Sequence, residues 1–216
     1  MKRPCFVVGG GSSLKNFDFS LLANQDSIVT NKAIFDTPNP KYFITVDYTF
    51  LRKIDLKKFK SIKTTKIFVA GFHHFYIRES RGQIVDTRYN LVYDLSPFNI
   101  IIKSNKAEGI GPSFDEFRTG LNSGYCALQL AIILGYKEIV LLGIDLNITK
   151  NTTHYHNGYK GSAVSFERKL EEYYHYFQDG LRQIELGYPD IKVISCSLES
   201  RLNGIIPYIS IAEILG

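Results

Sequence analysis

Seven short apolar runs, separated by longer stretches of mixed polarity, predict the strands of one sheet. The clearest, Ile139–Leu142, is aliphatic on both faces, as expected of a central parallel strand. The other runs are similar in length but include polar residues, so their strand pattern is weaker. The predicted strands are Cys5–Val8, Ser27–Thr30, Tyr42–Val46, Lys66–Ala70, Asn99–Lys103, Ile139–Leu142 and Ile191–Ser195.

Two longer segments have the pattern of helices. Tyr125–Leu134 is apolar on nearly every side, which predicts a buried helix, and Ser123 just before it is a candidate N-cap. Between Phe166 and Ile184 apolar residues recur every three or four positions, which predicts an amphipathic helix of about 20 residues. Residues 76–96 show no clean period and are expected to form an irregular excursion or a short hairpin.

Strands that alternate with helices predict an α/β fold. We expect a single Rossmann-like, doubly wound and mostly parallel sheet with helices on both faces. The chain has 216 residues, a usual length for one domain, so residues 1–216 are expected to form one nucleotide-binding α/β domain. Residues 147–161 are rich in Asn, Thr, Gly, His and Tyr and make a long connection after a strand, so they are a candidate short lid over the site.

Small and polar residues follow four of the predicted strands. In an open α/β sheet, ligands bind at the carboxyl ends of strands and at the N-termini of helices. A glycine-rich turn lets backbone N–H groups approach a phosphate, although this turn matches neither the Rossmann nor the Walker spacing and equally fits a plain tight turn. The residues at these ends are Gly10, Gly11, Ser12, Ser13, Asn31, Asp47, Gly143, Ile144 and Asp145, with Ser123 and Gly124 at the start of the buried helix.

The pair His154 and His156 leaves three interpretations open. One histidine can act as a general base, both can bind a metal together with His73 or His74, or both can be exposed loop residues. No G-x-S-x-G turn is present, so serine-hydrolase chemistry is not indicated.

Two aspartates at strand ends also leave alternatives. Asp47 and Asp145 can hold Mg²⁺ on a polyphosphate. Asp145 can instead accept a hydrogen bond from a ribose hydroxyl or a base amine, or cap the next turn.

Composition narrows the class of partner. The net charge of +5 and pI near 9.0 suit an anionic substrate or a peripheral membrane association. The basic residues are scattered, so nucleic-acid binding is not expected. No apolar run reaches the ~20 residues that span a bilayer, and the first apolar run is too short for a signal peptide. We therefore expect a cytoplasmic protein.

Several segments resemble bacterial lipooligosaccharide sialyltransferases. They are Gly11–Lys15, Asn31-Lys32, and Ser123-Gly124 ahead of LGYKEIVLLGID at 134–145. Those enzymes have a single α/β domain and transfer sialic acid from CMP-sialic acid without a metal. Through Pro40–Asp47 and Cys196–Leu202 the chain also resembles a wider family, which includes flagellin-glycosylation proteins, phage-encoded relatives and the archaeal hydroxymethylpterin diphosphokinase.

The resemblance implies roles for individual residues. His154 would be the general base, and Tyr155 would stand in for a phosphate-binding tyrosine. Asp47 departs from the sialyltransferases, which carry Asn there, and so favours the wider family, whose members bind metal. The nucleotide would contact Gly10, Gly11, Ser12, Ser13, Asn31, Ser123, Gly124, Gly143, Ile144 and Asp145.

The main hypothesis is a glycosyltransferase that needs no cofactor and uses a nucleotide-activated sugar donor, CMP-linked, and a glycan or small-alcohol acceptor. The alternatives are a Mg²⁺-dependent pyrophosphokinase with Asp47 and Asp145 as metal ligands, and a non-catalytic nucleotide- or sugar-binding relative. Because the lid between the Gly-Ile-Asp turn and His154 is short, we expect a partner subunit to complete it, and hence a homo-oligomer.

Overall fold

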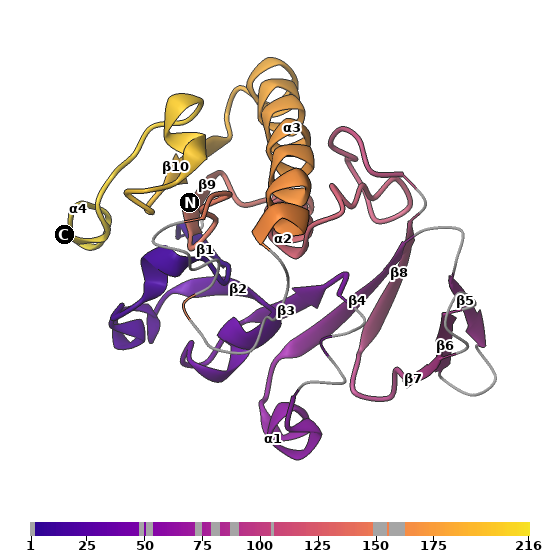
Figure 1. Ribbon diagram of the computed structural model, residues 1–216. Coiled ribbons are helices and arrows are strands. Elements are labelled where there is room, and N and C mark those ends of the chain that lie inside the picture. The colour runs from indigo at the N-terminus through magenta and orange to yellow at the C-terminus, as the bar shows by residue number, and fades with distance from the viewer. Residues whose placement is uncertain are drawn as a thin grey trace.

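The computed structural model has a central sheet of seven strands in the order β10–β9–β1–β2–β3–β4–β8 (Figure 1). It describes residues 3–47, 50, 54–71, 75–78, 83–86, 91–104, 106–148, 155 and 163–216. Every predicted strand is present, and no strand end differs from its prediction by more than one residue. The strands are β1 (Cys5–Val8), β2 (Asp26–Thr30), β3 (Tyr42–Thr45), β4 (Thr65–Gly71), β8 (Ile100–Ser104), β9 (Glu138–Leu142) and β10 (Lys192–Ser195).

The chain winds outward from β1 in two directions. It first runs through β2, β3, β4 and β8, and then returns to β9 on the other side of β1. At the end of β1, Val8 lies opposite Val29 of β2 and Leu142 of β9. All six strand pairings in this sheet are parallel, so the doubly wound fold is confirmed and the main sheet is wholly parallel.

Alternate strand residues fill two cores, one on each face. Cys5 and Val7 belong to the core beneath α2 (Ser123–Ile133) and α3 (Ala163–Gly187). Phe6 and Val8 belong to the core on the other face, with a cluster of phenylalanines. That face carries short elements: the 3₁₀ helices η1 (Ser12–Leu14), η2 (Phe19–Leu22) and η3 (Asn31–Phe35), with α1 (Leu56–Ser61) and α4 (Ile211–Leu215).

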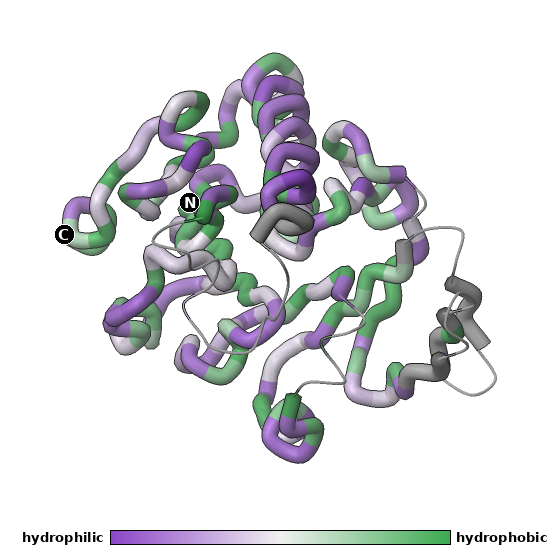
Figure 2. Tube along the Cα trace, viewed as in Figure 1, coloured by the Kyte–Doolittle hydropathy of each residue, from purple (hydrophilic) through white to green (hydrophobic). Residues whose placement is uncertain are grey.

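Helix α2 is buried from Ser123 to Ile132, as its sequence predicts. The ring of Tyr125 packs edge-on against Phe177 of α3, with 5.2 Å between centroids. Gly180 makes this close approach possible, because a Cβ there would lie 2.2 Å from the Tyr125 hydroxyl oxygen. Helix α3 therefore lies tightly on α2, with polar residues on its outward side (Figure 2).

A second sheet interrupts the α/β alternation. The strands β5 (Phe75–Arg78), β6 (Gln83–Asp86) and β7 (Leu91–Asp94) form an antiparallel sheet that lies beyond β8 (Figure 1). Of the two alternatives predicted for 76–96, the short hairpin is present in β5 and β6, and β7 extends it to three antiparallel strands. Four-residue runs that mix polar and apolar residues are too short to show a clear period, so the pattern did not reveal three separate strands. No helix within the described ranges is long and apolar enough to cross a bilayer.

Candidate functional site

The carboxyl ends of β1 and β9 lie side by side, because the two strands are paired up to Val8 and Leu142. From β1 the chain passes to β2 on one side, and from β9 it passes through α3 to β10 on the other. The strand order thus reverses here, and such a switch point is where open α/β sheets bind ligands.

Asp145 caps the glycine-rich turn that follows β1. Its Oδ2 accepts the backbone N–H of Ser13 at 2.8 Å, and its Oδ1 accepts the Ser13 hydroxyl at 2.6 Å. The side chain is only 3% exposed. A Cβ on Gly11 would lie 2.4 Å from the carboxylate, so glycine is required where the turn meets Asp145. The sequence had suggested a cap of the next turn in the chain, whereas these contacts are with the turn after β1, 132 residues away.

Ser197, just after β10, joins the same network. Its hydroxyl oxygen accepts the N–H of Gly143 at 2.8 Å and lies 3.1 Å from the hydroxyl oxygen of Ser13. Ser200 adds a hydrogen bond from its hydroxyl to the carbonyl of Ile144 at 2.7 Å. Sequence reasoning placed this segment only within the family resemblance and assigned Ser197 no contact.

Gly143 and Ile144 give the site its shape. The carbonyl of Gly143 accepts the N–H of Gly11 at 2.8 Å. The side chain of Ile144 lies between Gly9 and Gly124, where added Cβ atoms would come within 2.5 and 2.6 Å of its Cδ1. Ile144 therefore connects the turn after β1 with the start of α2. We call Gly9–Ser13, Gly143–Asp145 and Ser197 the glycine-turn cluster.

A second group of polar residues lies at the ends of β2 and β3 and the start of α2. Asn31 Oδ1 accepts the hydroxyl of Thr45 at 2.7 Å and that of Ser123 at 3.4 Å. The backbone of Asn31 has φ +49°, a conformation that Asn tolerates better than most residues. Among the described residues no group accepts a hydrogen bond from its Nδ2. We call Asn31, Thr45 and Ser123 the Asn31 cluster.

Asn122 caps α2, and the expectation that Ser123 is the cap was wrong by one residue. The Asn122 side chain accepts the N–H groups of Gly124 and Tyr125, at 2.8 and 3.2 Å. This leaves the Ser123 hydroxyl oxygen to accept the N–H of Val46 at 3.2 Å. Ser123 therefore joins α2 to the end of β3.

Asp47 lies at the edge of the Asn31 cluster. Its backbone N–H donates to the hydroxyl of Thr45 at 2.9 Å. The negative charge of Asp47 also acts on Tyr173 of α3. Burial, together with the negative charges of Glu172 and Asp47, raises the pKa of the Tyr173 hydroxyl to about 12. Sequence reasoning had treated Tyr173 only as a packing residue of the amphipathic helix.

Tyr155 is the single residue described between 149 and 162. Its backbone N–H donates to the carbonyl of Gly10 at 3.2 Å, and its hydroxyl donates to Asp36 Oδ2 at 2.7 Å. The connection after β9 thus comes back to the glycine-rich turn at Tyr155. The candidate base His154 lies outside the described residues, as do His73, His74 and His156.

Within the described ranges, the donors without an acceptor at this edge of the sheet include two backbone N–H groups and one side-chain amide. The N–H groups of Gly9, Gly11 and Ser13 are used within the glycine-turn cluster. Those of Gly10 and Ser12 have no acceptor within the described ranges, and neither has the side-chain Nδ2 of Asn31. Backbone N–H groups in such a turn bind phosphate and carboxylate groups.

The part of the chain that the structure describes contains no group of three or more His, Cys, Asp or Glu residues placed to bind a metal. A Mg²⁺ ion held by Asp47 and Asp145 would share the Asp145 carboxylate with the hydrogen bonds from Ser13. The backbone donors of the glycine-rich turn suit an anion.

No protein-family model matches the chain, and no curated protein matches its sequence. Solved structures match its fold. The sialyltransferase CstII from Campylobacter jejuni, in complex with the substrate analogue CMP-3FNeuAc, aligns with a TM-score of 0.56 at 17% identity, over 97% of this chain and 88% of that one. The shared feature is the fold.

Two further structures agree. Monomeric CstII aligns with a TM-score of 0.54 at 18% identity, over 96% of this chain and 86% of that one. The MAf glycosyltransferase from Magnetospirillum magneticum AMB-1 aligns with a TM-score of 0.50 at 14% identity, over 98% of this chain but 35% of that one. These structural neighbours match the families that the sequence segments resemble.

Proposed function

We propose that the protein is a glycosyltransferase of the sialyltransferase-like type, which moves a sugar from a CMP-linked donor to a hydroxyl acceptor. The observation that carries this proposal is a set of donors that have no acceptor among the described residues: the N–H groups of Gly10 and Ser12 at the switch point and the Nδ2 of Asn31 after β2. Fixed donors of this kind stabilise a departing phosphate as its charge grows. A nucleotide-sugar donor is supported by the fold, which is similar to that of a sialyltransferase solved in complex with CMP-3FNeuAc.

The position of Asp145 favours a monophosphate-linked donor over a polyphosphate. Its carboxylate lies against Ser13, directly beside the free N–H groups of the turn. An anion bound there experiences repulsion from this carboxylate, and the repulsion grows with the charge of the anion. A sugar-linked nucleoside monophosphate carries one negative charge on its phosphate, whereas a diphosphate or triphosphate carries more.

We assign the general base to His154. An imidazole titrates near neutral pH, so it can remove the proton of the acceptor hydroxyl while the bond between sugar and phosphate breaks. Support comes from Tyr155, the next residue along the chain, which contacts the carbonyl of Gly10 in the turn where the phosphate would bind.

Replacing His154 by Ala tests this assignment. We expect kcat to fall by about 10²- to 10⁴-fold, the range usual for general-base catalysis, while the Kd for CMP changes by less than about twofold. His156→Ala is the matched control, because it removes the neighbouring imidazole and should leave kcat nearly unchanged. Full activity in His154→Ala would show that another group accepts the proton.

A further inference from the structure

The hydroxyls of Thr45 and Ser123 converge on one oxygen, the Oδ1 of Asn31. Thr45 ends β3 and Ser123 begins α2, so the two hydroxyls come from elements 78 residues apart in the chain. The Thr45 hydroxyl lies 2.7 Å from the Asn31 oxygen and the Ser123 hydroxyl 3.4 Å. Thr45 is 0% exposed and Ser123 is 6% exposed. The protein therefore encloses both residues that contact the Asn31 oxygen.

Backbone N–H groups decide in which direction these hydroxyls donate. The Thr45 oxygen accepts the N–H of Asp47 at 2.9 Å, and the Ser123 oxygen accepts the N–H of Val46 at 3.2 Å. Each hydroxyl keeps one proton to donate. If the amide were rotated by half a turn, the described residues would offer these protons no acceptor except the other hydroxyl, at 3.4 Å. The oxygen of Asn31 therefore faces the hydroxyls, and its Nδ2 faces away from them.

Asn31 lies beside the glycine-rich turn. Val8 and Val29 are the last paired residues of β1 and β2, and Gly10 and Asn31 follow them by two residues each. The Thr30 hydroxyl donates to the carbonyl of Val8 at 3.3 Å and joins the two strands just before this point. The N–H of Gly10 and the Nδ2 of Asn31 therefore lie at neighbouring strand ends, where one anionic group can accept from both.

We propose that Thr45 and Ser123 orient the Asn31 amide, so that the site selects a ligand atom that accepts a hydrogen bond. The inference rests on the proposed function, in which this atom is an oxygen of the donor phosphate. A free Asn side chain can present its oxygen or its nitrogen, whereas an oriented amide presents the nitrogen without losing further rotational freedom on binding. Thr45 and Ser123 are therefore positioning residues, and Ser123 acts on the nucleotide through Asn31.

The first test removes the Thr45 hydroxyl. Thr45→Val keeps the shape of the side chain, and we expect the Kd for CMP, measured by isothermal titration, to rise about fivefold, a usual effect of one hydrogen bond. Thr45→Ser keeps the hydroxyl and should stay within about twofold of the wild type. The matched control is Thr37→Val, which should leave the Kd unchanged. Thr37 is 5% exposed, and its hydroxyl has no hydrogen-bond partner among the described residues.

A double variant separates orientation of the amide from general loosening of the site. If Thr45 acts on CMP only through the Asn31 amide, adding Thr45→Val to Asn31→Gly should leave the Kd at the value of Asn31→Gly alone. A purely structural role of Thr45 at the end of β3 predicts instead that the two effects add. Urea denaturation shows that each variant is folded under the conditions of the titration.

Asn31→Asp tests the direction of the contact. The carboxylate of this variant can still accept both hydroxyls, but it places a negative oxygen where the wild type has a donor. We expect it to raise the Kd for CMP at least about tenfold more than Asn31→Gly does, because the carboxylate repels a phosphate. A ligand hydroxyl at this point would instead donate to the carboxylate and leave the affinity of Asn31→Asp close to that of the wild type.

The side-chain NH₂ signals of Asn31 in an NMR spectrum give a readout that needs no ligand. Their loss in Asn31→Gly identifies them. We expect them to shift or broaden in Thr45→Val, where the amide can rotate, to return to their place in Thr45→Ser, and to stay unchanged in Thr37→Val.

The outcomes separate this inference from the proposed function. Absence of CMP binding by the wild-type protein would contradict the proposed function, whereas the NMR signals would still decide whether Thr45 orients the amide. Four results would each overturn the orienting role: a wild-type Kd in Thr45→Val, additive effects in the double variant, tight CMP binding by Asn31→Asp, or unchanged Asn31 signals in Thr45→Val.

Discussion

The glycine-turn cluster and the Asn31 cluster lie at the same edge of the sheet but use their polar groups differently. In the glycine-turn cluster, most donors and acceptors bond to one another, and Asp145 is only 3% exposed. In the Asn31 cluster, the side-chain carbonyl of Asn31 is turned inward to two hydroxyls and the amide nitrogen is left for a ligand.

The two clusters therefore have different roles: the first maintains the backbone shape of the site, and the second contributes to ligand affinity. The hydrogen bonds of the glycine-turn cluster fix the backbone around Gly10 and Ser12, whose N–H groups have no acceptor among the described residues. The Asn31 cluster offers a side-chain donor, so its substitution should affect ligand binding more than stability.

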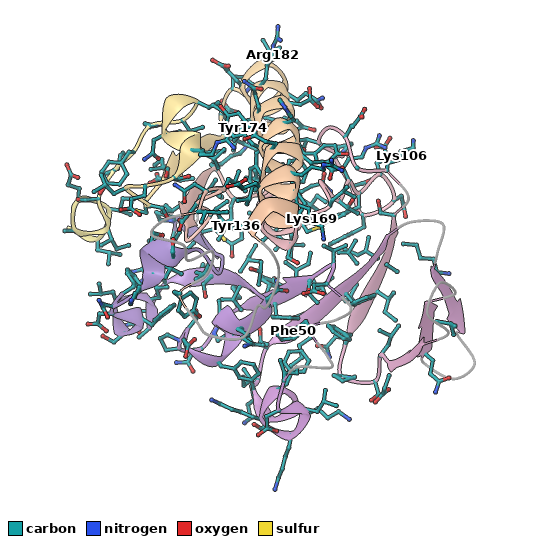
Figure 3. All side chains as sticks on the ribbon, viewed as in Figure 1. Phe50, Lys106, Tyr136, Lys169, Tyr174 and Arg182 are labelled. Atoms are coloured by element: carbon teal, nitrogen blue, oxygen red, sulfur yellow. The ribbon has the colours of Figure 1, made fainter. Side chains whose placement is uncertain are left out.

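Outside these clusters, Arg201 joins α3 to η6 (Arg201–Gly204). It binds Glu171 and lies over the ring of Tyr174 (Figure 3).

The largest expected effect is on stability, from Asp145→Ala. It leaves the backbone N–H of Ser13 without its acceptor and removes the 2.6 Å hydrogen bond from the Ser13 hydroxyl, beside a residue that is only 3% exposed, so we expect a loss of about 3 kcal/mol in the free energy of unfolding. The matched control is Asp47→Ala, the other strand-end aspartate, which is partly exposed and should lose less than about 1 kcal/mol. Urea denaturation measures both, and equal losses would remove the distinction between the two clusters.

A smaller effect is expected from Asn31→Gly, and it should fall on binding. Glycine accepts the positive φ at this position, so the backbone is kept while the side-chain donor is lost. We expect the Kd for CMP to rise about tenfold, equivalent to about 1.4 kcal/mol. Isothermal titration measures this change. An unchanged Kd would mean that the Asn31 cluster does not contact the nucleotide.

The smallest effect concerns alkaline pH and the tyrosine beside Asp47. Burial, Glu172 and Asp47 raise the pKa of Tyr173 to about 12 in the folded protein, against an ordinary value near 10. Between these pH values the unfolded chain loses the proton that the folded chain keeps, so stability falls as the pH rises. In Tyr173→Phe the decline from pH 10 to 12 should be shallower than in the wild type. The measurement is the free energy of unfolding of both proteins at several pH values between 10 and 12. The same dependence on pH in the two proteins would contradict this prediction.

The pattern of apolar residues was enough to predict the main sheet, because buried parallel strands such as Ile139–Leu142 have apolar residues on both faces and little else. It was also enough to find the polar strand ends, since the carboxyl ends of parallel strands share one edge. It did not reveal β5–β7, whose short strands mix polar and apolar residues.

The partners within the site were harder to predict from the sequence. Asp145 is separated from Ser13 by 132 residues and Asp36 from Tyr155 by 119, and no local pattern links residues so far apart. The cap of α2 shows the same limit at short range. Both Asn122 and Ser123 are good N-cap residues, and only the backbone angles of Asn122, φ −139° and ψ 132°, decide between them.

The most direct test of the account is a titration of the purified protein with CMP, UDP and ATP, each in Mg²⁺ and in EDTA. Free N–H donors beside a carboxylate should bind a nucleoside monophosphate without help from a metal. We predict that CMP binds with the same Kd in Mg²⁺ and in EDTA, and more tightly than ATP in EDTA. Binding of ATP that requires Mg²⁺, with no binding of CMP, would contradict the account and make Asp47 a metal ligand.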